Sequence, residues 1–197
     1  DLSRELSAEW YRTNGVARFT LFRSDTRNAL FSQTDTTKFP NVTNVQNVSL
    51  VRTRGAEASY DGVGVLWPWL DLTANATYTQ ATTVRNPRNP ASVGKQFYRI
   101  PRWRANVVAT WHASERIALT LAGRYSGRQY NTLDHSDVNP DTFGGASDFL
   151  TFDGKLTWKA NEHVDLGVGI DNITNRRYYV YYPYPSRTWQ VEATFHL

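Results

Sequence analysis

The sequence has 197 residues, with 22 lysines and arginines against 18 aspartates and glutamates, which gives a formal net charge of +4. The basic residues are scattered among acidic ones, so a nucleic-acid partner is not expected. The absence of cysteine excludes disulfides and thiolate metal sites. The longest stretch without charged or strongly polar side chains, about Gly62 to Leu70, is far shorter than the ~20 residues that a membrane-spanning helix needs.

Period-two alternation of apolar and polar side chains recurs along the chain and predicts about nine β-strands. In chain order, the expected strands cover residues 3–12, 16–26, 47–60, 70–79, 102–113, 117–126, 150–159, 164–171 and 189–197. The clearest of them has an apolar face that comprises Leu70, Leu72, Ala74, Ala76 and Tyr78. Helical spacing is almost absent. Strands with one apolar and one polar face are typical of a wall between lipid and water.

The connections between the expected strands alternate in length. The short turns cover residues 13–15, 113–116 and 160–163. The long polar loops cover residues 27–46, 84–100 and 131–147. Because outer-membrane barrels have tight periplasmic turns and long extracellular loops, the pattern predicts an all-β fold, an antiparallel transmembrane β-barrel. A soluble β-sandwich or β-solenoid is the alternative, since it also consists of short alternating strands.

The expected strands have the length that a bilayer requires. Ten residues at ~3.3 Å each, tilted by ~45°, span about 24 Å, which is comparable with the ~25 Å apolar band of such barrels. Aromatic side chains near strand ends are expected to form girdles at the membrane interfaces. These residues are Trp67, Trp69, Trp111, Trp158 and Trp189.

The odd number of strands predicts that the sequence is a portion of a longer chain. If residue 197 is periplasmic, counting back through about nine strands puts residue 1 outside the cell, where a bacterial barrel chain does not begin. The start, Asp1-Leu2-Ser3-Arg4, also lacks an initiator methionine and a signal peptide. We therefore expect residues 1–197 to be the C-terminal portion of a barrel domain.

One motif near the end of the sequence is specific. Residues 171–179, Asp-Asn-Ile-Thr-Asn-Arg-Arg-Tyr-Tyr, resemble the Asn-Leu-(Thr/Phe)-(Asn/Asp)-Lys-(Arg/Lys)-Tyr signature near the end of TonB-dependent receptors. An aromatic, proline-rich loop at 181–187 and a last amphipathic strand follow in the same order as in that family. Weaker resemblances lie at residues 21–28, 47–57 and 100–106. The family commonly ends in Phe, which the barrel-assembly machinery reads, whereas this sequence ends in Leu197.

The resemblance implies a role in transport. TonB-dependent receptors are Gram-negative outer-membrane barrels of about 22 strands, so this chain is expected to supply the last nine or so, without the plug domain or TonB box. They import scarce nutrients, most often a ferric siderophore. The implied partners are that ligand, TonB-ExbB-ExbD acting on the plug, the barrel-assembly machinery, and outer-membrane lipid or lipopolysaccharide. No cofactor is expected, and a passive porin is the alternative function.

The aromatic loop has two interpretations. Tyr181, Tyr182 and Tyr184 either mark the outer interfacial girdle or stack on a ligand at the barrel mouth. The prolines between them hold the loop in few conformations, which reduces the entropy lost on binding. Arg187 could pair with an anionic group of the ligand.

Two more arginines, Arg124 and Arg128, fall on the polar, lumen-facing register of the strand at 117–126. Asp153 and Lys155 do so on the next strand. Such residues either touch the ligand or pair with charges of the wall and the plug.

A metal site and a catalytic site are not predicted. Asp134, His135 and Asp137, near Asp141, are weak candidates for holding a hard cation, but the spacing does not match an EF-hand loop and a solvated acidic loop is the simpler interpretation. The histidines are scattered, and no metalloprotease or nucleophile-elbow motif is present. The chain is therefore expected not to be an enzyme.

Overall fold

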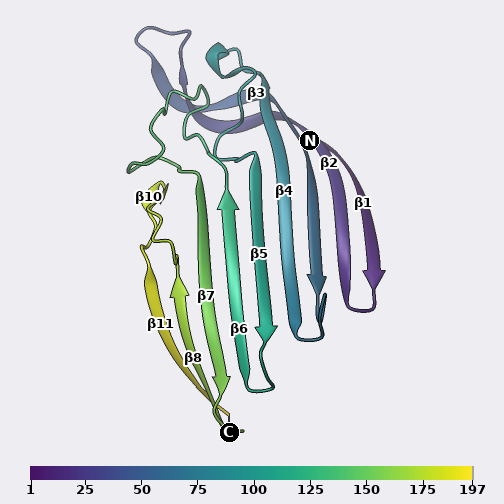
Figure 1. The fold of residues 1–197 in the computed structure, drawn as a ribbon. Helices are drawn as coiled ribbons and strands as arrows, with labels where there is room; N and C mark the ends of the chain where they lie inside the picture. The colour runs from purple at the N-terminus through teal and green to yellow at the C-terminus, as the bar shows by residue number, and fades with distance from the viewer. Residues whose placement is uncertain (197) are drawn as a thin grey trace.

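Nine strands pair in one antiparallel sheet in the order β1-β2-β3-β4-β5-β6-β7-β8-β11, as the alternation predicted (Figure 1). The structure is a computed structural model that describes residues 1–196. The strands of this sheet are β1 Leu2–Arg12, β2 Gly15–Asp35, β3 Val42–Gly62, β4 Leu70–Arg85, β5 Trp103–His112, β6 Ile117–Ser126, β7 Phe149–Lys159, β8 Val164–Asp171 and β11 Thr188–Phe195. A short 3-10 helix, η1 (Pro90–Ser92), and a small hairpin of β9 (Tyr179–Val180) and β10 (Tyr182–Pro183) lie in the connections.

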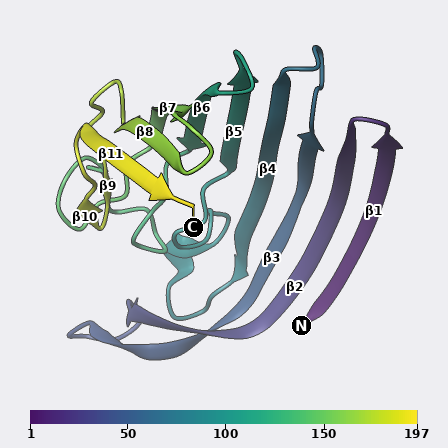
Figure 2. The same cartoon turned by 90° about the horizontal axis from the view of Figure 1, so that it is seen from below.

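The sheet is strongly curved, and the long connections lie inside the curve (Figure 2). The polar face is the concave one, since the segment after β8 packs on it: the backbone N–H of Asn172 donates to Asp153 Oδ1 at 2.8 Å. We call this the lumen face and the opposite, apolar face the outward face. No helix among residues 1–196 is long and apolar enough to cross a bilayer.

Cross-strand pairing joins the apolar faces of neighbouring strands into one surface. Leu21 pairs with Ala56, Ala56 with Tyr78, and Tyr78 with Trp103. Residues directly opposite each other share a face, so the outward face is a continuous apolar band. Further round the sheet, Leu156 and Val168 remain 47% and 48% exposed. The soluble-sandwich alternative is wrong, because these side chains would then be buried between two sheets.

The lumen face carries polar contacts that link its strands, either directly paired strands or, for Lys155 of β7 and Glu192 of β11, the strands on the two sides of β8. Lys155 and Glu192 pair at 2.7 Å, and Thr110 and Thr120 share a hydrogen bond of 3.0 Å. Arg124 pairs with Asp153 at 3.0 Å. These contacts place charged side chains of wall residues in the lumen, as the register predicted for Arg124, Asp153 and Lys155.

The connections confirm the predicted alternation with one exception. The turns at 13–14, 113–116 and 160–163 are short, and those at 86–102, 127–148 and 172–187 are long. The expected long loop at 27–46 is wrong, because β2 and β3 stay paired as far as Asp35 and Val42. This extension projects beyond the other strands (Figure 1). The apolar–polar alternation of this extension is weak because neither of its faces has to meet lipid. Backbone pairing and packing on other loops stabilise it instead.

The buried apolar cluster of the described residues lies where this extension meets the long loops. Val48, Val51 and Leu133 form it, and Phe31 and Phe97 pack against it. The cluster therefore fastens the β2–β3 hairpin to the loops at 86–102 and 127–148. The predicted strand at 189–197 is described as far as Phe195, and Leu197 lies outside the described residues.

Candidate functional site

A pocket on the lumen face lies where β5, β6 and β7 meet the loops after β6 and β8. Its volume is about 230 Å³. The side chains that matter for recognition are Arg104, Asn106, Arg124, Phe149, Tyr178 and Tyr184. Arg104 and Asn106 alternate with outward residues on β5, and Asn106 pairs directly with Arg124 on β6. Strand periodicity thus brings two guanidinium groups to one side of the sheet.

Aromatic rings form the other wall of this pocket. Phe149 stacks on Tyr178 with ring centroids 4.3 Å apart, and Tyr178 stacks on Tyr184 at 4.8 Å. Tyr178 is only 3% exposed, and burial raises the pKa of its hydroxyl. The phenol therefore stays neutral at physiological pH, and the stack offers a flat apolar surface beside the two cations.

The two arginines of the pocket differ in their partners. Arg124 is held by Asp153 through contacts of 3.0 and 3.3 Å. Within residues 1–196, no carboxylate lies within ion-pair distance of Arg104, although Glu57 lines a neighbouring depression with it. An exposed, unneutralised guanidinium beside an aromatic stack suits an anionic ligand that has a planar group.

Asn172 positions the loop that carries the tyrosines. Its side chain donates from Nδ2 to the Arg176 carbonyl and accepts from the Arg176 N–H, both at 2.9 Å. It is 4% exposed and has a φ of 52°. This left-handed conformation is tolerated by asparagine better than by most residues. The first Asn of the signature motif therefore acts as a brace that starts the loop.

The predicted tyrosines separate into two groups. Tyr184 lies in the pocket, whereas Tyr181 and Tyr182 form a second aromatic cluster with Phe143, at centroid distances of 5.9 and 5.4 Å. Arg99 lies over the Tyr181 ring at 5.2 Å. This cluster connects three of the long loops and is half exposed, so direct ligand contact by Tyr181 and Tyr182 stays a prediction.

Two predicted arginines lie away from the pocket centre. The expectation that Arg128 continues the lumen register of its strand is wrong, because β6 ends at Ser126. Arg128 instead donates to the carbonyl oxygens of Asp137 and Val138 at 2.7 and 3.1 Å, which braces the loop. Arg187 similarly donates to the Ile173 carbonyl at 2.6 Å. Contact of either side chain with a ligand stays a prediction.

The weak cation-site candidates are used in local turns. Asp137 accepts from the Asn131 N–H at 2.6 Å and from Thr132 Oγ1 at 2.8 Å. His135 stacks on Tyr130 at 3.5 Å. Within residues 1–196, no three His, Cys, Asp or Glu side chains come close enough together to hold a metal ion.

The carboxylate of Asp134 accepts hydrogen bonds within such a turn. Burial alone would raise the pKa of Asp134, but hydrogen bonds from Ser136 and Thr132 outweigh it and keep the pKa below its usual value. Its charge is therefore stabilised by the loop itself, without a cation.

Sequence reasoning missed six residues of the pocket and of the second aromatic cluster, namely Arg99, Arg104, Asn106, Phe143, Phe149 and Tyr178. Arg104 could have been predicted from the sequence, since it lies on the polar face of the strand expected at 102–113. Tyr178 lies in the signature motif. For Phe143 no periodic pattern exists, because its position depends on contacts between loops.

Comparisons with known proteins give a consistent result. The family model described as "TonB dependent receptor-like, beta-barrel" matches residues 2–173. The ferric enterobactin receptor PirA of Pseudomonas aeruginosa is 27% identical over 192 residues, which cover 90% of this chain and 24% of that protein. The chain therefore spans about a quarter of the length of this relative.

Two solved structures share the fold at lower sequence identity. The siderophore receptor PiuA of Acinetobacter baumannii has a TM-score of 0.74 and 18% identity, over 98% of this chain and 27% of that chain. The ferric yersiniabactin uptake receptor FyuA of Yersinia pestis has a TM-score of 0.73 and 17% identity, over 99% of this chain and 30% of that chain. At such identities the likeness shows the fold alone.

Proposed function

The chain belongs to the TonB-dependent receptor β-barrel family, and on that premise we propose that it forms part of an outer-membrane importer whose cargo is an anionic ferric siderophore. The named relatives and structural neighbours are receptors and transporters rather than enzymes. In this proposal the chain supplies a section of barrel wall and several ligand-gathering loops. The plug, and TonB-ExbB-ExbD acting on it, belong to the remainder of the receptor.

The observation that carries the proposal is the lumen pocket. Arg104 and Arg124 supply positive charge, and the stack of Phe149, Tyr178 and Tyr184 supplies flat apolar surface. A ferric complex of catecholate groups is negatively charged and presents aromatic rings. It would meet both features at once, with guanidinium groups binding oxygen atoms and the rings stacking.

The first prediction concerns the two pocket arginines. Replacing both in the full-length receptor, Arg104→Gln with Arg124→Gln, is expected to weaken binding of ferric enterobactin at least tenfold. The reason is that a hydrogen bond to a charged group contributes about 1.5–3 kcal/mol. The measurement is a titration of the purified receptor in detergent, followed by quenching of its intrinsic fluorescence.

The control for this prediction is Arg18→Gln, which removes a lumen-facing arginine of β2 that pairs with Glu9 at 2.5 Å and lies outside the pocket. It should leave the affinity unchanged. If the double variant binds as tightly as the parent receptor, the pocket is not the ligand site. If no ferric siderophore binds the parent at all, the cargo assignment is wrong.

A passive porin predicts a different result in liposomes. A barrel closed by a plug should not admit small sugars, whereas a porin has an open aqueous channel. Swelling of liposomes that contain the full-length receptor therefore separates the two functions, and rapid swelling in arabinose would contradict the importer.

A further inference from the structure

A patch of arginines lies on the outward face of β1, β2 and β3. Arg4 pairs with Arg23, and Arg23 pairs with Arg54, so three guanidinium groups occupy directly opposite positions on adjacent strands. The next outward row adds Arg52 and, across from it, Asp25. We call Arg4, Arg23, Arg27, Arg52 and Arg54 the outward arginine patch.

Charge in this patch is not balanced by the protein. Asp25 is the one carboxylate among the outward residues of these rows, and two arginines share it: Arg52 binds it at 2.8 and 3.0 Å, and Arg23 lies 4.0 Å from it. Arg54 donates to the neutral Gln80 at 2.9 Å. In the described part of the chain, neither Arg4 nor Arg54 has a carboxylate within ion-pair distance. Like charges directly opposite each other destabilise a sheet, so this row favours a bound anion.

The patch lies at the border of the apolar band, where a bound anion would belong to a lipid headgroup. The next row on the same face consists of Leu6, Leu21 and Ala56, and it continues through Tyr78 to Trp103. Tyr78 and Trp103 pack with ring centroids 4.9 Å apart. Aromatic pairs of this kind mark the membrane interface of barrels. The arginines therefore border the apolar band on the side of the long loops, at the depth of lipid headgroups.

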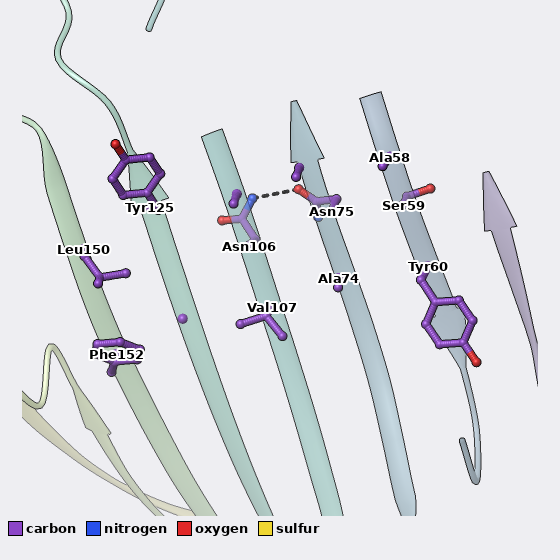
Figure 3. A pocket seen from close by; sticks show the side chains of 13 residues that line it. Ala58, Ser59, Tyr60, Ala74, Asn75, Asn106, Val107, Tyr125, Leu150 and Phe152 are labelled. Carbon is purple, nitrogen blue, oxygen red and sulfur yellow. Dashed lines mark hydrogen bonds between the residues drawn. The ribbon is translucent and has the colours of Figure 1, made fainter. Parts of the chain in front are cut away.

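A groove in the apolar band lies on the same face as the patch, and Figure 3 shows the side chains that line it. Its floor is made of small residues, Ala58, Ala74, Ala76, Ala105 and Gly123. Tyr60 borders it on one side and Phe152 with Leu150 on the other. The volume is about 450 Å³. Ala58 lies four residues from Arg54 on the same face of β3, roughly 13 Å along the strand.

We propose that the outward arginine patch and the adjoining groove together bind one lipid of the outer leaflet that carries more than one phosphate group, with its headgroup on the arginines and an acyl chain in the groove. Guanidinium groups bind phosphate oxygens in pairs, and the patch extends over three strands, about 10 Å, which suits several phosphates better than one. The proposal requires the membrane placement of the barrel but not the identity of its cargo.

The test uses the full-length receptor in phosphatidylcholine vesicles that contain a small fraction of diphosphoryl lipid A. Co-purified lipid A is measured as glucosamine per receptor after gel filtration in mild detergent, because the phosphatidylcholine of the vesicles also carries phosphate. The triple variant Arg4→Gln, Arg23→Gln, Arg54→Gln is expected to bind this lipid about a hundredfold more weakly, since each arginine near a charged membrane surface contributes about a fivefold change. Ala76→Phe, which fills the groove, is expected to reduce retention with the arginines intact.

Matched controls separate this site from general effects. Arg18→Gln removes a charge from the lumen face of the same strand as Arg23, and Ala109→Phe enlarges an outward alanine of β5 outside the groove; both should retain the lipid as the parent does. Equal retention by the triple variant and the parent would overturn the proposal. Inorganic phosphate that displaces the lipid at matched phosphate concentration would show a simple phosphate site instead.

Siderophore titration of the same triple variant distinguishes this proposal from the transport proposal. The variant is expected to bind ferric enterobactin like the parent receptor, because the patch and the pocket lie on opposite faces of the sheet. Loss of lipid with intact siderophore binding supports the lipid site alone. Loss of both in a protein that still folds would show that the patch is not a separate site.

Discussion

Gly55→Ala in the full-length receptor is expected to prevent assembly of a folded barrel. A Cβ atom at this position would contact the backbone carbonyl of Tyr78 well inside van der Waals distance and would lie 2.5 Å from Cζ of Phe22. The ring can move, but the carbonyl belongs to the β3–β4 ladder and cannot. Overpacking costs about 1–3 kcal/mol where side chains can adjust, so we expect a loss of at least about 3 kcal/mol here.

The measurement for Gly55→Ala is the heat-modifiable band of the receptor in outer-membrane fractions, comparing heated with unheated samples. Gly169→Ala is the matched control, since it is also a lumen-facing strand glycine but its Cβ would meet Gln190 at an ordinary 3.6 Å. Adding Phe22→Leu to Gly55→Ala removes the ring contact only and should not restore folding. Full restoration would show that the backbone contact is not the cause.

Asn172→Leu is expected to cost at least about 3 kcal/mol of unfolding free energy. Leaving the N–H and carbonyl of Arg176 without partners costs about 1–3 kcal/mol each if they stay buried, and a branched residue at this φ of 52° adds about 1–2 kcal/mol. The loop that carries Tyr178 and Tyr184 would then lose its fixed start. Faster hydrogen exchange across residues 172–187 and weaker siderophore binding are the expected observations.

Two further variants separate the causes of the Asn172 effect. Asn172→Gly accepts the same backbone conformation but lacks the side-chain hydrogen bonds, so most of the loss should remain. Thr174→Ala, at an exposed position in the same loop, should change nothing. If Asn172→Gly exchanges hydrogen as slowly as the parent, the side-chain hydrogen bonds do not hold the loop.

The strands were predictable because each separates two environments. Leu70 to Tyr78 and Leu150 to Trp158 alternate strictly, since one side faces an apolar phase and the other faces the lumen. The continuation of β2 and β3 past residue 26 was not predictable in this way. There the strands leave the apolar band, and Phe31 packs on the loop residues Phe97 and Tyr98 instead. Cross-strand pairing and these contacts with other loops then decide the conformation.

The candidate site was predictable only in part, for a related reason. Arg124 could be assigned to the lumen because strand register fixes it. Tyr184 was proposed from the aromatic loop, but its stacking partner Tyr178 depends on how the loop folds back over β7. The prediction for Arg128 was wrong because it extended the two-residue period of β6 past the end of the strand. A loop begins at residue 127, and the period does not hold there.

The long loops at 86–102, 127–148 and 172–187 are joined to one another by specific hydrogen bonds. Arg99 donates to Asn131 at 2.8 Å, His135 bonds the Gln96 carbonyl at 2.8 Å, and the backbone N–H of Gly144 donates to the Tyr181 carbonyl at 2.7 Å. Independent fluctuation of any one loop would break contacts with the others. These loops therefore behave as a single mechanical unit, so a displacement of one segment shifts its neighbours with it.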